Sequence, residues 1–230
     1  MRKYILLILS LLCTCYCFAQ KTVTQKNRLT ELVMERYSVM DTNKQIKQGL
    51  YQAIYWHRTV IATGTYDNNV KTGIWHFFDT RGRLVENFDY DNLRLLYEEP
   101  MDSISSEHII YAFDNTFKDT DHVTKPIKIG GRCYGYIPYM KFFMLSHDFD
   151  DLNILRFTAI LELLISPGGR LADFKVHIKS PDFERITTFS TELIDDEDKI
   201  FIPATLNRKP ILSRIFVKCR ITDDGGLDVD

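Results

Sequence analysis

Excess charge of either sign is missing from this 230-residue chain. Lys and Arg number 29 against 31 Asp and Glu, which gives a formal net charge of −2. Its short basic clusters, such as Arg208-Lys209, are offset by acidic runs, such as Asp195-Asp196-Glu197-Asp198. A protein that holds a phosphate backbone needs a basic surface, so we exclude nucleic acid as an expected partner.

The chain also lacks the short motifs of the common enzyme classes. It contains no G-x-S-x-G, no P-loop and no H-E-x-x-H, and its six histidines are scattered. The most metal-like cluster, His147-Asp148-Phe149-Asp150-Asp151, has no second histidine at ligand spacing and is typical of a solvated acidic loop. We therefore expect a protein that is not an enzyme and that has no cofactor and no metal site.

Cysteine is scarce and unevenly placed, with three of the five cysteines among the first 17 residues. This N-terminal segment has a basic start, Arg2-Lys3, an apolar run over residues 4–18 and a small residue, Ala19, at its end. Such a pattern is typical of a secretory signal peptide, and the run is shorter than the roughly 20 residues that span a bilayer. We predict that residues 1–19 are a cleaved signal peptide and that the mature chain is periplasmic or secreted, without a membrane span. Retention of the segment as an inner-membrane anchor is the alternative.

Only Cys133 and Cys219 would remain after that cleavage, in a compartment where a disulfide can persist. Cys219 also shares one face of a strand-like segment with Ile215 and Val217, where a thiol would serve as a small buried residue. The sequence leaves both interpretations open, a Cys133–Cys219 disulfide or two buried thiols.

An internal repeat occupies the first half of the chain. Gly49-Leu50-Tyr51 recurs as Gly73-Ile74-Trp75, and Tyr66-Asp67-Asn68 recurs as Tyr90-Asp91-Asn92, both at an offset of 24 residues. Several matches at one offset indicate two copies of one supersecondary unit. Each copy is predicted to be a β-hairpin, with Gly82 of the second copy at a turn position that favours a positive φ.

The stretch GTYDNNVKTGIWHFFDTRGRLVENFDY, residues 64–90, resembles the MORN-type repeat of bacterial secreted proteins and of an antitoxin-like family related to it. In the first copy Arg58 stands in place of the turn glycine. The resemblance implies an antiparallel sheet of hairpins over residues 20–97, with no chemistry of its own.

The C-terminal part shows a second pattern. Apolar and polar residues alternate over residues 155–165 and again over residues 172–179, and Ser166-Pro167-Gly168-Gly169-Arg170 between them is typical of a hairpin turn. Residues 183–195 carry apolar side chains at helical spacing. With a last strand over residues 212–221, the predicted order is β-β-α-β, an antiparallel sheet with a helix on one face.

Two stretches, LLISPGGRLADFKVHIKS and FIPATLNRKPILSRIFVKCRI, resemble the C-terminal domain of TonB-type energy transducers. Phe201, Pro203, Ala204 and Asn207 match the family's step into its last strand, where Arg208 replaces the usual glycine. The expected fold class is therefore α+β, in a layout that resembles exported Bacteroidetes-type proteins. Its parts are the hairpin repeats at 20–97, a linker at 98–125, a TonB C-terminal-like domain at 126–222 and an acidic tail at 223–230.

In the TonB family, the resemblance implies, the last strand binds an extended peptide of an outer-membrane transporter by strand addition. We accordingly expect a non-catalytic adaptor that binds a protein or peptide of the cell envelope through Arg214, Phe216, Lys218 and Arg220. An anchored energy transducer is a less favoured alternative, because the chain has no Pro-rich linker that could cross the periplasm. Another alternative is that the hairpins bind envelope carbohydrate or protein through exposed aromatic residues, such as Tyr55, Trp56 and Phe78.

Overall fold

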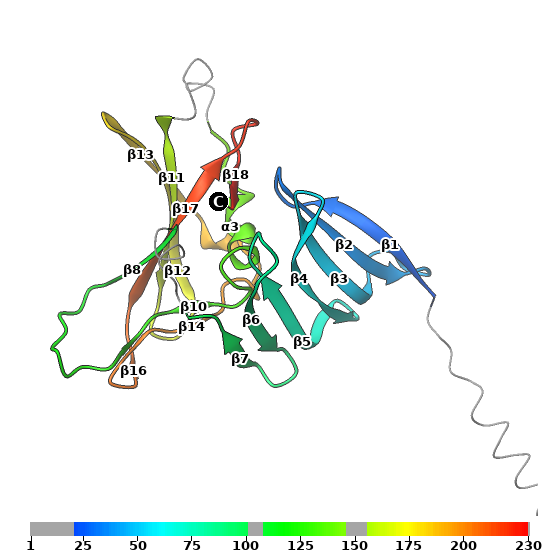
Figure 1. Ribbon diagram of the computed structural model, residues 1–230, viewed down its shortest axis with the longest axis horizontal. Coiled ribbons are helices and arrows are strands. Elements are labelled where there is room, and N and C mark those ends of the chain that lie inside the picture. Colours follow the sequence, from blue (N-terminus) through cyan, green and yellow to red (C-terminus); the bar gives the residue numbers. More distant parts are fainter. Residues whose placement is uncertain (1–20, 101–107, 146–155, 230) are drawn as a thin grey trace, which may run out of the picture.

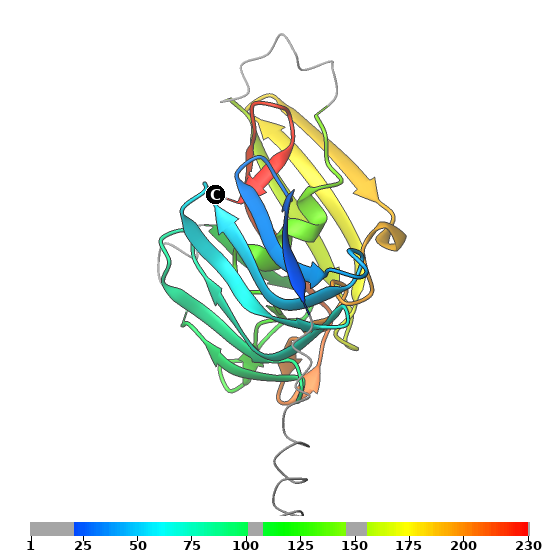
Figure 2. The same cartoon turned by 90° about the vertical axis from the view of Figure 1, so that its right-hand side faces the viewer.

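The computed structural model describes residues 21–100, 108–145 and 156–229. The predicted signal peptide and the metal-like cluster at 147–151 lie outside these ranges. Within them the chain is mostly antiparallel β-sheet with one short α-helix, and its two large sheets share one core (Figure 1 and Figure 2).

The first sheet has seven strands whose order follows the chain. The two repeat copies form its hairpins β3–β4 and β5–β6, as the sequence predicts. Gly82 has a φ of 83°, as its turn position predicts, and the repeat glycines Gly49 and Gly73 have φ of 97° and 64°. The strands are β1 (Thr22–Arg28), β2 (Val33–Met40), β3 (Lys47–Tyr55), β4 (Thr59–Asp67), β5 (Val70–Phe78), β6 (Leu84–Asp89) and β7 (Arg94–Glu98).

The second sheet has six strands whose order does not follow the chain. Four of them lie side by side in the order β13, β12, β11 and β17, and β8 and β18 both pair with the remaining side of β17. The alternation of buried residues along β11 and β17 confirms the two strands predicted there. The strands are β8 (Ile109–Phe113), β11 (Thr158–Ile165), β12 (Leu171–Ser180), β13 (Phe183–Phe189), β17 (Ser213–Ile221) and β18 (Leu227–Val229).

Two small sheets and three short helical segments complete the described structure. One sheet pairs β10 (Ile127–Lys128) with β14 (Phe201–Ile202). The other places β15 (Thr205–Leu206) between β9 (Val123–Thr124) and β16 (Lys209–Pro210). The helical segments are the 3-10 turns η1 (Tyr134–Tyr136) and η4 (Thr191–Leu193) and the helix α3 (Ile137–Met140).

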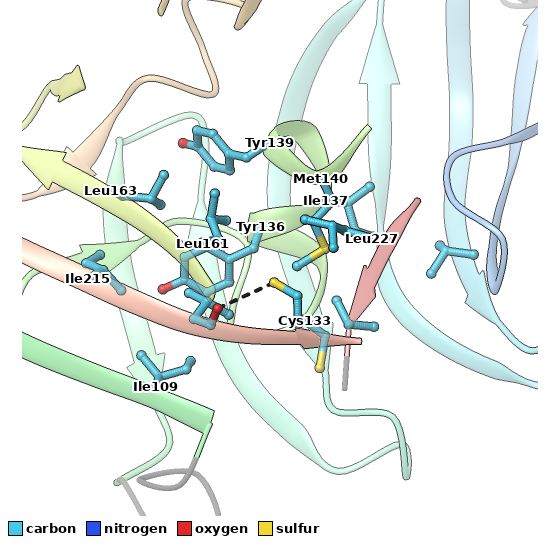
Figure 3. Packing of buried hydrophobic residues seen from close by; sticks show 14 of the residues in the cluster. Ile109, Cys133, Tyr136, Ile137, Tyr139, Met140, Leu161, Leu163, Ile215 and Leu227 are labelled. Carbon is cyan, nitrogen blue, oxygen red and sulfur yellow. Dashed lines mark hydrogen bonds between the residues drawn. The ribbon is translucent and has the colours of Figure 1, made fainter. Parts of the chain in front are cut away.

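The core lies between the two large sheets, around η1 and α3. One cluster of buried apolar residues runs from Val33 and Trp75 in the first sheet to Leu161 and Ile215 in the second. Helix α3 contacts β18, and Figure 3 shows Ile137 and Met140 next to Leu227. Burial of apolar surface at about 25 cal/mol per Å² therefore holds both halves of the chain together.

The helix predicted at residues 183–195 is wrong. Residues 183–189 form strand β13, which pairs with β12, and only Thr191–Leu193 form a helical turn. Pro181 and Asp182 make the short connection between β12 and β13, and Thr187 and Thr188 are β-branched residues that suit a strand. Three strands, β11, β12 and β13, therefore precede β17 in the second sheet, where the sequence predicts two strands and a helix.

The predicted linker and tail also contain structure. Strand β8, inside the expected linker 98–125, pairs with β17 from Ser213 to Val217. Strand β18, inside the expected tail 223–230, has all three residues buried. The Asp228 carboxylate also accepts a hydrogen bond from the backbone N–H of Leu32 at 2.7 Å, which ties the C-terminal strand to the first sheet.

Cys133 and Cys219 are both buried thiols, and no disulfide joins them. The disulfide interpretation is therefore wrong for this structure. Burial raises the pKa of the Cys133 thiol to about 12, so it is a weak nucleophile at neutral pH.

Candidate functional site

The four residues predicted to bind a partner do lie together. Arg214, Phe216, Lys218 and Arg220 alternate along β17 and share the face opposite Ile215, Val217 and Cys219, which are buried. Their common face is the outer surface of the second sheet.

The expected mode of binding is not open to this strand, however. β17 pairs with β11 over residues 213–219 on one side and with β8 and β18 on the other. Strand addition needs an edge whose backbone groups are available. Because β17 lies inside the sheet, only its side chains face the solvent.

Part of that outer face is already occupied by ion pairs. The guanidinium of Arg214 contacts the carboxylates of Asp114 and Glu162. The ring of His177 on β12 lies 2.6 Å from Glu162 and 3.2 Å from Glu184. Arg214 therefore holds neighbouring strands of the sheet in register, and it is a poorer partner contact than the sequence predicted.

An available edge lies elsewhere, at β13. This strand pairs with β12 over all seven of its residues, and no strand of the described chain pairs with its other side. Phe183 is 41% exposed and Ile186 is 53% exposed. Figure 1 places β13 at the end of the molecule opposite to β1, away from the first sheet.

A second feature is a cavity of about 450 Å³ between the first sheet and the segment that carries η1 and α3. Its wall includes the repeat tyrosines Tyr51 and Tyr66, together with Tyr134. Four cations and four carboxylates complete the charged part of the wall: Arg28, Lys47, Lys71, Lys141, Glu35, Asp195, Glu197 and Asp198. The charge of the wall is thus balanced.

Two lysines of this wall, Lys47 and Lys71, lie over aromatic rings. The ammonium of Lys47 lies 4.6 Å from the centre of the Tyr37 ring and 5.1 Å from that of Tyr66. The ammonium of Lys71 lies 5.2 Å from the centre of the Trp75 ring and contacts Glu197 at 2.7 Å. Cation–π contacts of this kind contribute roughly 0.5–2 kcal/mol each and keep the lysine positions fixed.

A smaller cavity of about 320 Å³ lies on the other side of Lys71 and Glu197 and is mostly apolar. Buried Lys128 borders it and donates a hydrogen bond to the Asp198 carbonyl at 2.6 Å. Burial lowers the pKa of Lys128 to about 8, and it raises the pKa of the Asp198 carboxyl. Asp198 thus lies in the wall of two cavities.

A buried carboxylate, Glu86 on β6, faces the first glycine pair of the C-terminal half. It accepts hydrogen bonds from the backbone N–H groups of Gly130 at 2.9 Å and Gly131 at 3.2 Å. Burial raises the pKa of Glu86 to about 7, although the two amide hydrogen bonds act in the opposite direction. Gly130 and Gly131 have φ of 117° and 68°, a conformation that aims both N–H groups at one acceptor.

Sequence reasoning missed these buried charges because they come from distant positions. Lys71, Glu86, Lys128 and Asp198 lie on four separate segments, and only the fold brings them together. The paired glycines Gly130 and Gly131, in PIKIGG at residues 126–131, are the one local sequence signal of this site. Glycines that adopt positive φ can form a loop whose N–H groups bind an anion.

The described residues contain no group of three or more His, Cys, Asp or Glu side chains that could hold a metal ion. Across residues 21–100, 108–145 and 156–229, no helix is long and apolar enough to cross a membrane. The chain matches no protein-family model, no curated protein and no solved structure. The resemblances to MORN-type repeats and to the TonB C-terminal domain therefore stay predictions.

Proposed function

We propose that this chain is a non-catalytic interaction protein of the cell envelope that binds an extended segment of a partner along β13. The observation that carries the proposal is that, among the described strands, β13 is paired on one side only, whereas β17 is paired on both. Backbone hydrogen bonds to the added strand would supply affinity, and the side chains of β13 would select the register.

The composition of β13 distinguishes it from the other long edge. β1 also has seven residues, but its exposed residues are polar, among them Lys26 and Arg28. Lysine and arginine on an edge discourage pairing with another strand. β13 also exposes two charged residues, Glu184 and Arg185, but it differs from β1 in exposing the apolar Phe183 and Ile186, which a bound strand would cover.

Backbone amide shifts of isotope-labelled protein test this proposal, with periplasmic peptides of outer-membrane transporters as the probes. We expect the shifts to map to residues 183–189 and to disappear when alternate backbone nitrogens of the peptide are methylated, because methylation removes the donors but keeps the side chains. Ile186→Lys should weaken binding by about tenfold, which corresponds to about 1.4 kcal/mol. Arg220→Ala on β17 serves as the matched control and should leave binding unchanged.

Two outcomes would reject the proposal. One is that shifts map to β17 and depend on Arg220. The other is that no peptide in the series shifts any residue of β13.

A second candidate function uses the 450 Å³ cavity. Its balanced charge and its tyrosine hydroxyls suit an uncharged polar ligand, such as a sugar of the envelope, better than they suit an ion. A glycan array with Lys71→Met tests it, because Lys71 fixes the wall through Glu197 and Trp75. Trp56, which is 65% exposed on a hairpin turn, provides the contrast. Binding lost in Trp56→Ala but kept in Lys71→Met would favour the exposed aromatic residues over the cavity.

A further inference from the structure

A third cavity, of about 290 Å³, lies where the two large sheets meet beside β17. In the register of that strand Val217 lies opposite Ile109 of β8 and Cys219 lies opposite Val229 of β18. Exposed Lys218 therefore lies at the gap between β8 and β18, where the outer face of the sheet meets the cavity. The turn between β5 and β6, which begins at Asp79, closes the cavity from the side of the first sheet. The site is separate from β13 and from the cavity of balanced charge.

The wall of this cavity carries an excess of positive charge. Four cationic residues, Arg81, Arg83, Arg132 and Lys218, line it against one acidic residue, Asp79. Among the described residues, Glu99, which contacts Arg132 at 3.0 Å, is the one further carboxylate in this group of ion pairs. At this cavity the described cations therefore outnumber the described carboxylates by two, although the whole chain has a net charge of −2.

The two carboxylates are taken by two of the cations. Asp79 lies 2.8 Å from Arg83 and 3.3 Å from Arg132, and Glu99 contacts the same two guanidinium groups. Burial on its own would raise the pKa of Asp79, but hydrogen bonds from Arg83 and Arg81 outweigh it and hold the pKa below its usual value. Asp79 is therefore ionised at neutral pH and fully engaged.

The other two cationic residues of this cavity are Arg81 and Lys218. Both are exposed, and neither has an ion pair within the described residues. They border the same cavity from different sheets, with an apolar wall between them made of Ile109, Cys133, Met140, Val217 and Val229. Two available cations beside an apolar wall suit a molecule that has an anionic group at one end and an apolar group at the other.

We propose that this cavity binds a small amphipathic anion, with its carboxylate between Arg81 and Lys218 and its apolar part against Met140 and Val217. The size is adequate, because a cavity of about 150 Å³ holds a benzene molecule and this one is roughly twice as large. The charged end stays near the solvent, so that its desolvation cost is small.

Calorimetric titration with three probes tests the proposal on the full mature chain. Octanoate carries both groups, octanol carries the apolar group alone, and inorganic phosphate carries the charge alone. We expect octanoate, below its micelle-forming concentration, to bind at least about tenfold more tightly than either of the others, because it alone combines a charge-assisted hydrogen bond with the burial of an apolar chain.

Two variants connect that binding to the site. The double variant Arg81→Ala/Lys218→Ala should lose about tenfold or more of the octanoate affinity. Arg220→Ala removes another exposed cation two residues further along β17 and should bind octanoate as the wild type does. Circular dichroism of each variant checks that the fold is kept.

The proposal is overturned if the double variant binds octanoate as tightly as the wild type, or if octanol binds as tightly as octanoate. It is also overturned if phosphate matches octanoate, because the apolar wall would then contribute nothing. Binding at β13 would be unaffected by each of these results, so the two proposals fail independently.

Discussion

The two large sheets of this molecule are assembled in different ways. In the first sheet each strand pairs with the next one in the chain, and short turns connect them. In the second, β17 pairs with β8, about a hundred residues earlier, and with β11, about 50 to 60 residues earlier, and only β18 follows it across a short turn. Local pairing can be recognised from turn residues, whereas distant pairing leaves almost no local signal.

The two sheets also concentrate their stability in different places. The first sheet buries an aromatic cluster on its inner face, where Tyr51 and Tyr66 contact Trp75 at ring distances of 5.3 and 5.2 Å. The second sheet depends on apolar strands and is completed by a short strand at the C-terminus. We therefore expect the terminal strands of the two sheets to respond differently to the same kind of substitution.

The largest effect should come from β18. Leu227→Ala together with Val229→Ala removes two buried side chains and should lower the free energy of unfolding by about 5 kcal/mol. Val23→Ala on β1 is the matched change at the other terminal strand, and because that residue is only half-buried it should cost less than about 1 kcal/mol. Urea unfolding followed by circular dichroism measures both. Equal losses would contradict the difference between the sheets.

The second-largest loss of stability should come from a substitution on the inner face of the first sheet. A Cβ atom added at Gly64 would lie 2.2 Å from two ring atoms of Trp75, which is fully buried and cannot move aside. Gly64→Ala should therefore cost about 3 kcal/mol, the upper end of the usual range for overpacking. Gly73→Ala is the control, since its Cβ would meet nothing within 4 Å and only the φ of 64° would cost about 1 kcal/mol. Equal urea midpoints for the two variants would show that the Trp75 contact is not rigid.

Sequence reasoning succeeded where structure is local. The repeat hairpins, the turn at Gly82 and the alternation along β11 and β17 follow from neighbours in the chain. It failed at residues 183–195, where Phe183, Ile186 and Phe189 fit a helical period. Pairing with β12 decides the conformation there, and two of these three apolar residues, Phe183 and Ile186, are exposed rather than packed on a core.

The candidate sites were still harder to foresee. Arg214, Phe216, Lys218 and Arg220 do share one face, because alternation along a strand is a local property. Whether β17 is an edge depends on β8 and β18, which come from segments that look like a linker and a tail. The pairing of β8 is a property of the whole fold, so no local pattern could have shown it, whereas Gly225-Gly226 is a local turn signal for the β17–β18 hairpin that sequence reasoning missed.

The buried charges at the junction of the sheets predict a pH dependence. The folded pKa of Glu86, about 7, lies above its value of 4.5 in the unfolded chain, so its contribution is present at low pH and is lost as pH rises through 7. The folded pKa of Lys128, about 8, lies below 10.5, so its contribution is lost as pH falls through 8. Stability should therefore be lowest between these two values.

We expect the free energy of unfolding at about pH 7.5 to be about 2 kcal/mol lower than at about pH 5 or about pH 9.5. Urea titrations at the three pH values measure it. Glu86→Gln should flatten the acidic side of the profile alone, and Lys128→Met should flatten the alkaline side alone. A profile that is the same in both variants and in the wild type would show that these two residues do not titrate in this range.

The smallest effect concerns a turn beside the second sheet. Arg208 occupies the place of a glycine in the TonB-type pattern and has a φ of 67°, so the tight turn forms in spite of its side chain. Arg208→Gly relieves a cost of about 1 kcal/mol for the left-handed backbone but makes the unfolded chain more flexible, so the net gain should be about 0.5 kcal/mol.

Arg58 is the matched position in the first sheet, where an arginine also replaces a turn glycine of the repeat. There the positive φ values fall on Trp56 and His57, at 46° and 58°, and Arg58 is not among the residues with positive φ. Arg58→Gly therefore relieves no strain and should lower the urea midpoint, whereas Arg208→Gly should raise it. If both changes shift the midpoint in the same direction, the backbone of one of the two turns differs from the one described, because the two substitutions are chemically identical and differ only in the φ they meet.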